Sequence, residues 1–365
     1  MDELRFGIIG TGMMGCEHIG NLDALPGAVV TALSDPTTAS LTGAAAFCDP
    51  SVAQFADHRD LLASGLVDAV IVASPNHTHR SVLDDCWGTD VAVFVEKPLC
   101  TTVTDALAVQ RAAAEHDALV WMGLEYRYFP AVGDLIDEVR AGTAGQVHMV
   151  AVREHRYPFL VKVDDWNRFT VNTGGTLVEK CCHFFDLMNQ VTGTRPLRVL
   201  ASGGQNVNHL DEVYDGRRAD ILDNAFVIVD YPDGVRASLD LCMFAEGSRW
   251  EQELCVVGDA GKIEAHVPGF AEIARGATPE LVIGSRGRDW PVATRPIDHG
   301  DVGHLGTHHG SSYVELERFA AAIRAGTEAE VTIDDGVWSV AMGVAAHRSI
   351  DEGRPVDLAE FGLEG

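Results

Sequence analysis

The sequence has little lysine, and positive charge of any kind is scarce. Its 365 residues include four lysines and 23 arginines against 54 acidic residues, for a formal net charge of −27. Nucleic acids and anionic membrane surfaces are bound through clusters of Lys and Arg that neutralise phosphate, and a chain this acidic would repel both. We therefore expect no nucleic-acid partner and no membrane partner.

Long apolar runs and paired cysteine motifs are also missing. Apolar residues make up 46% of the chain. They occur in short runs, far below the roughly 18 consecutive residues of a membrane-spanning helix. The start, Met1-Asp2-Glu3, is acidic and unlike a secretion signal. The eight cysteines form no C-x-x-C pair, which is typical of reduced thiols. Together these absences predict a cytoplasmic protein.

The length predicts two domains, because one hydrophobic core seldom organises 365 residues. In the first third of the chain, apolar runs alternate with helical segments, a pattern that predicts an α/β fold with a parallel, doubly wound sheet. The expected strands are residues 4–9, 28–34, 69–73, 91–95 and 119–122, and the expected helices are residues 16–25, 38–47, 77–86 and 104–116.

A glycine motif, G-x-G-x-x-G, joins the first expected strand to the first expected helix. Gly10 permits a sharp turn, Gly12 lets the backbone approach a pyrophosphate, and Gly15 lets helix and strand pack closely. Asp35 closes the second strand, where a carboxylate accepts hydrogen bonds from the adenosine ribose hydroxyls and repels a 2′-phosphate. The motif predicts a dinucleotide site that prefers NAD to NADP. A plain strand–helix turn, with Asp35 only opening the turn at Pro36, is the alternative.

Three further segments carry motifs in a characteristic order. They are Ser74-Pro75-Asn76-His77-Thr78-His79, Val95-Glu96-Lys97-Pro98 and the run from Gly174 to Asp186, while His18 extends the glycine motif. Together they resemble the glucose–fructose oxidoreductase / inositol dehydrogenase (Gfo/Idh/MocA) family over essentially the whole chain. The resemblance implies a Rossmann domain over residues 1–124 and an α+β domain with an open, mostly antiparallel sheet over residues 125–365. It also implies that a helix near residues 334–352 packs back on the first domain.

The resemblance implies an NAD-dependent dehydrogenase that acts on a secondary hydroxyl of a sugar, cyclitol or glycoside, with hydride passing to or from nicotinamide C4. It implies that Lys97, His183 and Glu179 are catalytic, Glu179 standing where the family usually has Asp. The implied cofactor contacts are Gly10, Gly12, Met13, Met14, Gly15, Asp35, Ser74, Asn76, His79, Glu96 and Lys97. A homodimer or homotetramer is expected by analogy with the family.

The chemistry of these residues agrees with such roles. Oxidising an alcohol requires a base that titrates near neutrality, which suits His183. A charged Lys97 would lower the pKa of the histidine and stabilise a developing alkoxide. On one helix, Glu179 and His183 would share a face, so the carboxylate could hold either the imidazole or a substrate hydroxyl, and Asp186 is a second candidate for orienting the imidazole. No metal is needed for this reaction. The plainer alternatives are a half-buried helical histidine and a lysine at a strand end.

Aromatic and polar residues ahead of the glycine-rich loop are candidates for substrate contact. Tyr157, Trp166 and Arg168 suit a sugar, whose ring faces stack on aromatic rings while its hydroxyls form hydrogen bonds. The same residues equally suit a contact between domains. His308 and His309 precede a helix and are expected either to line the pocket or to shape the start of that helix.

Three residues near His183 are expected to have structural roles. Lys180 would point to another side of the helix from Glu179 and is expected to form a structural ion pair. Cys181 and Cys182 are adjacent, so a disulfide between them would be strained, and core packing is expected instead.

Two other functions remain open at this stage. One is an enzyme that keeps its NAD bound and uses a transient 3-keto sugar to cleave a glycoside, without net redox turnover. The other is a sensor that binds NAD and a partner protein but catalyses nothing. The presence of both Lys97 and His183 argues against the sensor, which needs neither. The sequence does not identify the substrate.

Overall fold

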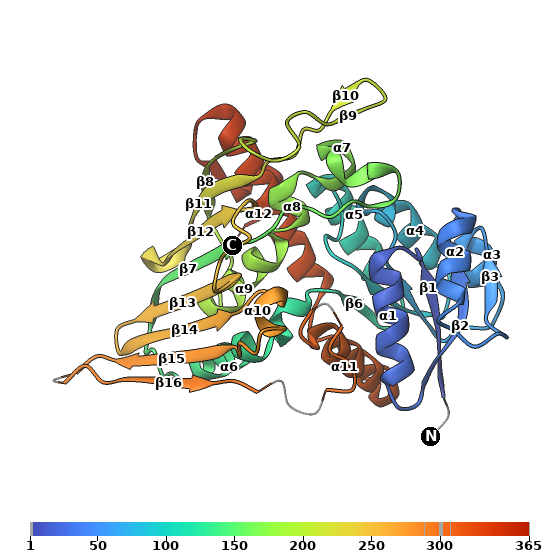
Figure 1. Cartoon of the computed structure of the whole chain (residues 1–365), viewed down its shortest axis with the longest axis horizontal. Coiled ribbons are helices and arrows are strands. Elements are labelled where there is room, and N and C mark those ends of the chain that lie inside the picture. Colours follow the sequence, from blue (N-terminus) through green and yellow to red (C-terminus); the bar gives the residue numbers. More distant parts are fainter. Residues whose placement is uncertain (1–2, 288, 299–301, 307, 365) are drawn as a thin grey trace.

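The computed structural model describes residues 3–287, 289–298, 302–306 and 308–364. Two large sheets lie side by side, with a six-stranded sheet from the blue end of the chain and a nine-stranded sheet from the green-to-orange part (Figure 1). Residues near the C-terminus, in brown and red, form helices that lie against both. The expected α/β class with a second, mostly antiparallel sheet is confirmed.

The six strands of the N-terminal sheet are all parallel, in the order β3-β2-β1-β4-β5-β6. The strand order reverses between β1 and β4, and ligands of such sheets bind beyond the carboxyl ends of the strands at this point. The strands are β1 (Leu4–Ile9), β2 (Ala28–Ser34), β3 (Ala53–Phe55), β4 (Ala69–Val72), β5 (Ala92–Val95) and β6 (Val120–Met122). The helices are α1 (Met13–Ala24), α2 (Thr38–Ala45), α3 (His58–Ala63), α4 (His79–Cys86) and α5 (Val103–Ala113), with a 3-10 turn, η1 (Asn76–Thr78).

The expected strands and helices of this sheet are confirmed, with ends that shift by a few residues. The sequence misses β3 and α3, because a three-residue edge strand and a six-residue helix are too short to show a hydrophobic period.

The second sheet has the order β16-β15-β14-β13-β7-β12-β11-β8-β17, and only β7 and β12 pair in parallel among its described strands. Its strands are β7 (Val147–His155), β8 (Arg198–Gly204), β11 (Asn224–Asp230), β12 (Arg236–Cys242), β13 (Gln252–Gly258), β14 (Gly261–Val267), β15 (Glu280–Ser285), β16 (Val292–Pro296) and β17 (Val356–Asp357). A separate ribbon is formed by β9 (Val213–Tyr214) and β10 (Arg217–Arg218). The helices are α6 (Pro130–Arg140), α7 (Thr170–Thr173), α8 (Thr176–Glu179), α9 (Cys182–Thr192), α10 (Phe270–Ile273), α11 (Ser311–Ala325) and α12 (Ile333–Glu352). The 3-10 turns are η2 (Glu125–Tyr128), η3 (Val163–Arg168), η4 (Pro232–Gly234) and η5 (Leu358–Phe361).

One face of the nine-stranded sheet is covered by helices. Helices α6, α9 and α12 pack against β14, β7 and β8 respectively. Side chains therefore alternate along β11: Ala225, Val227 and Val229 are buried, while Phe226 and Ile228 are 67% and 47% exposed. The face opposite the helices carries apolar side chains that no described part of the chain covers.

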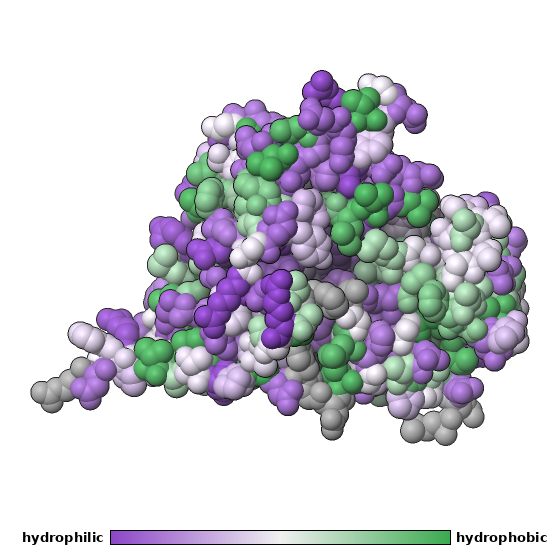
Figure 2. Space-filling view, in the orientation of Figure 1, coloured by the Kyte–Doolittle hydropathy of each residue, from purple (hydrophilic) through white to green (hydrophobic). Residues whose placement is uncertain are grey.

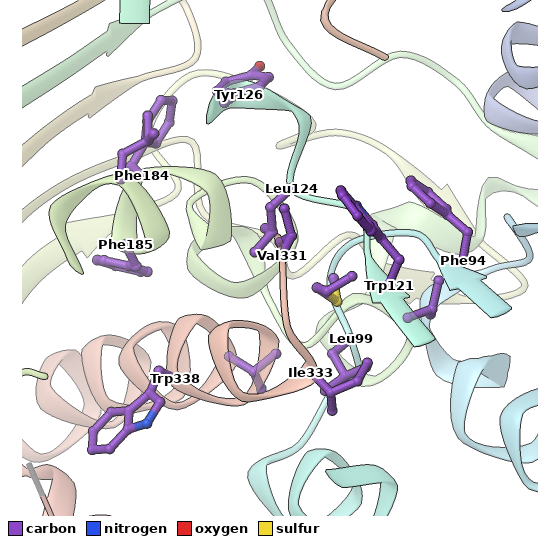
Figure 3. Packing of buried hydrophobic residues seen from close by; sticks show 14 of the residues in the cluster. Phe94, Leu99, Trp121, Leu124, Tyr126, Phe184, Phe185, Val331, Ile333 and Trp338 are labelled. Atoms are coloured by element: carbon purple, nitrogen blue, oxygen red, sulfur yellow. The ribbon is translucent and has the colours of Figure 1, made fainter. Parts of the chain in front are cut away.

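Helix α11 returns to the six-stranded sheet. Its Phe319 packs against Phe6, Phe94 and Trp121, with ring centroids 6.3, 5.6 and 6.0 Å away. Helix α12 contacts α5 and β6 as well as α9 and β8. Figure 3 shows this junction, with Leu99 of the first domain beside Ile333 of α12. The last part of the chain thus completes the cores of both domains.

Among the described helices, none is both long enough and apolar enough to cross a membrane. Hydrophilic and hydrophobic residues are mixed over the face that Figure 2 shows, from which the β15–β16 hairpin projects.

Candidate active site

Three glycines shape the loop between β1 and α1. Gly10 has φ of +93°, and a Cβ there would lie 2.5 Å from the backbone nitrogen of Ser74. A Cβ on Gly15 would lie 2.1 Å from the carbonyl oxygen of Gly10. By contrast, a Cβ on Gly12 would meet no described atom within 4 Å. The fold therefore requires glycine at positions 10 and 15, whereas Gly12 keeps a surface open beside the loop.

This open surface lies at the N-terminus of α1, which fits a dinucleotide pyrophosphate. Helix α1 begins at Met13, directly after Gly12, and no side chain caps it. Its first N–H groups therefore remain available to an anion, and the helix dipole favours negative charge there. Met13 is 53% exposed and Met14 is half-buried at the same opening.

Asp35 follows the carboxyl end of β2, next to the same loop. One carboxylate oxygen accepts a hydrogen bond from the backbone N–H of Thr11 and the other from that of Thr37, each at 2.8 Å. These bonds fix the carboxylate beside the glycine loop. Because a carboxylate oxygen accepts more than one hydrogen bond, capacity remains for a ribose diol.

Two residues expected to contact the cofactor form buried bonds within the protein. Glu96 pairs with His18 at 2.6 Å, and it also accepts a hydrogen bond from the backbone N–H of Lys97. His79 lies between the carbonyl oxygens of Pro98 and Ser74, each 2.9 Å from a ring nitrogen. Glu96 and His79 therefore hold the loops after β4 and β5. Asn76 is buried there too, and donates to the carbonyl of Thr173 at 3.4 Å.

Lys97 extends from the end of β5 toward the second domain. Its Nζ donates to the carbonyl oxygen of Glu179 at 3.3 Å. Burial by itself would lower the pKa of Lys97, yet interactions with Cys182 and Glu179 raise it above its ordinary value. The ammonium therefore stays charged at neutral pH.

His183 lies in the first turn of α9 and is 2% exposed. Its ring stacks on Tyr126, with centroids 4.0 Å apart, and its Nε2 lies 3.6 Å from Oε1 of Glu125. Burial holds the pKa of His183 well below its ordinary value, and the positive charges of Lys97 and Lys180 lower it further. The imidazole is therefore neutral at neutral pH and is ready to accept a proton.

The expected pairing of Glu179 with His183 along one helix is wrong. Helix α8 ends at Glu179 and α9 begins at Cys182, so a turn separates the two residues. Instead, Oε1 of Glu179 lies 3.4 Å from Nζ of Lys162, whose ammonium sits 4.6 Å from the ring of Trp166. Glu179 accepts a hydrogen bond from Lys97 through its backbone carbonyl, and its carboxylate acts on Lys97 through charge.

Asp186 does not orient His183 either. Its carboxylate accepts hydrogen bonds at 2.6 and 2.5 Å from Arg127, which also pairs with Asp335 at 3.0 Å. These buried charges tie η2 to α9 and α12. Asp186 therefore belongs to a structural ion-pair network.

The three candidates for substrate contact lie in different surroundings. Arg168 is 2% exposed and bonds to Glu212 and to the carbonyls of Phe159 and Leu160, so it holds its own loop together. Tyr157 is half-buried under the guanidinium of Arg156. Trp166 is also half-buried, but it lies beside Lys162 and 6.2 Å from the ring of His77. Of the three, Trp166 is the one that lies beside Lys162, the lysine that pairs with Glu179.

The structural interpretations of the neighbouring residues are confirmed. Lys180 pairs with Glu154 at 3.0 Å and donates to Oη of Tyr126. Cys181 and Cys182 are buried free thiols in the core. Within the described residues, no group of His, Cys, Asp and Glu is arranged to hold a metal ion.

Two sequence models of one oxidoreductase family match the chain. The NAD-binding Rossmann model covers residues 4–124, and the C-terminal alpha/beta model covers residues 136–358. The chain belongs to the Gfo/Idh/MocA family. It is therefore an NAD-dependent oxidoreductase, and the resemblance drawn from the motifs is confirmed.

Similar members of the Gfo/Idh/MocA family include inositol dehydrogenases. The chain is 26% identical over 363 residues to myo-inositol 2-dehydrogenase from Thermotoga maritima, covering 98% of this chain and 99% of that one. It is 27% identical over 364 residues to inositol 2-dehydrogenase from Rhizobium meliloti, covering 98% and 99%. A levoglucosan dehydrogenase solved with NADH and levoglucosan shares the fold, with a TM-score of 0.83 at 19% identity over 98% of this chain and 100% of that one.

Three residues of this Gfo/Idh/MocA site are not predicted by the sequence motifs. Glu125 and Tyr126 touch His183, and Lys162 pairs with Glu179. Glu125 could have been found, because it follows β6 just as Lys97 follows β5, and both lie at the carboxyl edge of the parallel sheet. Lys162 carries no such signal, since it lies in an irregular loop.

His308 lies next to Glu125 of the candidate site. Its Nδ1 is 3.3 Å from Glu17 on α1, and its Nε2 is 3.9 Å from Glu125. His309 has φ of +56° and lies just before α11, where it meets the ring of Phe129. Of the two interpretations of this pair, His308 fits pocket lining and His309 fits the start of the helix.

Proposed function

We propose that this chain is an NAD-dependent dehydrogenase of a cyclitol or sugar, which oxidises one secondary hydroxyl. The observation that carries the proposal is the hydrogen bond from Lys97 of the first domain to the carbonyl of Glu179, four residues before His183 in the second. The charge of Lys97 acts on His183, and both lie beside the strand ends where a Rossmann sheet binds its cofactor.

His183 and Lys97 have different chemical roles at the substrate hydroxyl. Nε2 of neutral His183 removes the hydroxyl proton, which the low pKa of the buried imidazole permits at neutral pH. The Lys97 ammonium donates a hydrogen bond to the same oxygen and stabilises its developing negative charge. Glu179 holds Lys97 through its carbonyl and Lys162 through its carboxylate, so that it positions both lysines. Bound NAD supplies the hydride acceptor.

The cofactor contacts follow from the open surface at Gly12. The first turn of α1 would hold the pyrophosphate, Asp35 would accept hydrogen bonds from the ribose hydroxyls, and Ser74, Asn76 and the loops held by His79 and Glu96 would contact the rest of the cofactor. Asp35 selects NAD over NADP, because a 2′-phosphate would lie against its carboxylate.

A cyclitol or sugar is favoured as substrate because relatives over the full length include proteins named inositol dehydrogenases, and a structural neighbour was solved with levoglucosan. The ring of Trp166 beside Lys162 supplies the mixed aromatic and polar surface that polyols require.

A substrate panel tests the proposal. The purified protein is incubated with NAD and, one at a time, with inositol stereoisomers, aldoses and 1,6-anhydro sugars, and NADH formation is followed by absorbance. We expect turnover with at least one polyol and none in the His183→Ala variant. Binding of NAD without turnover on any polyol, at any pH from acidic to alkaline, would remove the proposal.

A further inference from the structure

The carboxylate of Glu125 faces Nε2 of His183, the nitrogen that the proposed function assigns to the substrate proton. Oε1 of Glu125 lies 3.6 Å from Nε2 of His183, and both side chains are almost fully buried. The other ring nitrogen, Nδ1, is buried without a hydrogen-bond partner among the described residues. His183 therefore cannot pass a proton from Nδ1 to a hydrogen-bond acceptor among the described residues. Oε1 of Glu125 is the nearest acceptor at the nitrogen on which the proton arrives.

A path continues from Glu125 toward the surface. Nε2 of His308 lies 3.9 Å from the same Oε1, and Nδ1 of His308 lies 3.3 Å from Oε1 of Glu17 on α1. The side chain of His308 is 25% exposed, whereas those of Glu125 and His183 are 3% and 2% exposed. The four groups thus lead from a closed site to solvent. Such distances are often long in a site without substrate and shorten when it binds.

The charges around Glu125 suit a group that both takes and gives a proton. Burial raises the pKa of this carboxyl and the negative charge of Glu96 raises it further, while His308 and Lys97 lower it. Glu315 of α11 is a further carboxyl that interacts with Glu125. It accepts hydrogen bonds from the indole N–H of Trp121 and from the backbone N–H of Leu124. Burial therefore raises the pKa of Glu125 and lowers that of His183, which reduces the difference between the two and favours transfer of a proton from His183 to Glu125.

We propose that Glu125 is a catalytic proton acceptor, which relays the substrate proton from His183 to His308 and so to solvent. The substrate O–H bond breaks as Nε2 of His183 gains the proton. Oε1 of Glu125 then takes that proton and restores neutral His183, and the carboxyl passes it to Nε2 of His308. His308 releases a proton from Nδ1 to Glu17 or to water. In the reverse direction, the same groups deliver one proton to the carbonyl oxygen being reduced.

The proposal rests on the proposed dehydrogenase function, and its first test uses chemical rescue. The Glu125→Ala variant leaves a space the size of a small carboxylate, and we expect its kcat to fall about 10²-fold, as for loss of a proton-transfer group. Added formate should raise the kcat of this variant at least tenfold. Formamide, which has the same shape but no basic carboxylate, should leave kcat unchanged. Equal rescue by both compounds, or rescue by neither, would overturn the relay.

A second readout does not depend on turnover. Labelled imidazole signals of His183 are followed by NMR against pH, without substrate or cofactor, in the wild type and in Glu125→Gln. Loss of the facing carboxyl group should change the pH at which His183 is protonated by about one unit or more, because two interacting groups titrate as a pair. An unchanged titration would refute the coupling. If the titration moves as expected but no polyol is turned over, the proposed function fails and the coupling stands.

Two controls separate the relay from other roles of Glu125. Glu264→Gln removes a carboxylate from the surface of β14 and should change neither readout. NAD affinity, measured by calorimetry, should stay within about twofold of the wild type in Glu125→Gln. A loss of NAD affinity of tenfold or more with an unchanged titration of His183 would show that Glu125 holds the cofactor, and would overturn the relay.

Discussion

The imidazole of His183 lies flat against the phenol ring of Tyr126, with planes only 7° apart. The hydroxyl of the same tyrosine accepts a hydrogen bond from Lys180, which pairs with Glu154. One side chain therefore joins the proposed base to a buried ion pair of the second domain, and its two ends can be tested separately.

The two ends of Tyr126 predict different effects. Tyr126→Phe keeps the stacked ring but leaves Lys180 without this hydrogen bond, so we expect a loss of about 1–3 kcal/mol in stability with kcat nearly unchanged. Tyr126→Leu removes the stacking surface as well and should lower kcat roughly tenfold, because the imidazole is no longer held. Thermal melting and turnover measure the two effects. A fall in kcat as large in the Phe variant as in the Leu variant would argue against a stacking role.

Lys97 and His183 are expected to act as one unit. His183→Ala should lower kcat by about 10²–10⁴, and Lys97→Ala by about 10²–10³. The double variant should be little worse than the poorer single variant. NAD affinity should survive in all three, since the pyrophosphate and ribose sites lie elsewhere. Near-normal turnover in either single variant, with the fold intact by circular dichroism, would exclude that residue from the mechanism.

The same pair predicts a shift in pH dependence. The positive charge of Lys97 helps to hold the pKa of His183 below its ordinary value. In Lys97→Met this pKa should rise, so His183 becomes protonated, and inactive as a base, at a higher pH than in the wild type. The acidic limb of kcat/KM should therefore move to higher pH. Lys97→Arg keeps the charge and should leave the limb in place, even if turnover falls.

Two substitutions in the glycine loop should affect cofactor binding and folding stability separately. Gly12→Ala adds a methyl group to open space at φ of −74°, so its melting temperature should stay near that of the wild type. NAD affinity should nevertheless fall by tenfold or more, because the methyl group occupies the approach of the pyrophosphate. Gly15→Ala should instead destabilise the fold, since its methyl group meets the carbonyl of Gly10. Unchanged NAD affinity in Gly12→Ala would place the pyrophosphate away from this loop.

The exposed face of the nine-stranded sheet predicts self-association. Phe226, Ile228 and Leu200 are 67%, 47% and 41% exposed, and Ile228 pairs with Leu200 on the neighbouring strand, so exposed apolar side chains adjoin one another on this face, as at many interfaces. We expect a homodimer or homotetramer by light scattering at micromolar concentration, and Phe226→Asp should shift it toward the monomer. Thr294→Asp, on the exposed edge strand β16, is the matched control. A monomeric wild-type protein would remove the prediction.

The sequence predicts the N-terminal sheet well and the site only in part. Strands such as β4 and β5 are short apolar runs buried on both faces, so their composition reveals them directly. The turn between Glu179 and Cys182 does not show in the sequence, because helical spacing continues through it. Glu125 meets His183 only through the packing of η2 against α9, and contacts between elements this distant in the chain leave no local pattern.

The return of α11 to the first sheet means that the nucleotide-binding domain is not a continuous stretch of the gene. A fragment ending at residue 124 would encode all six parallel strands, but the rings of Phe6, Phe94 and Trp121 would lose their cover from Phe319. Such a fragment would expose these rings to solvent unless the rest of a host enzyme supplied a helix in the place of α11.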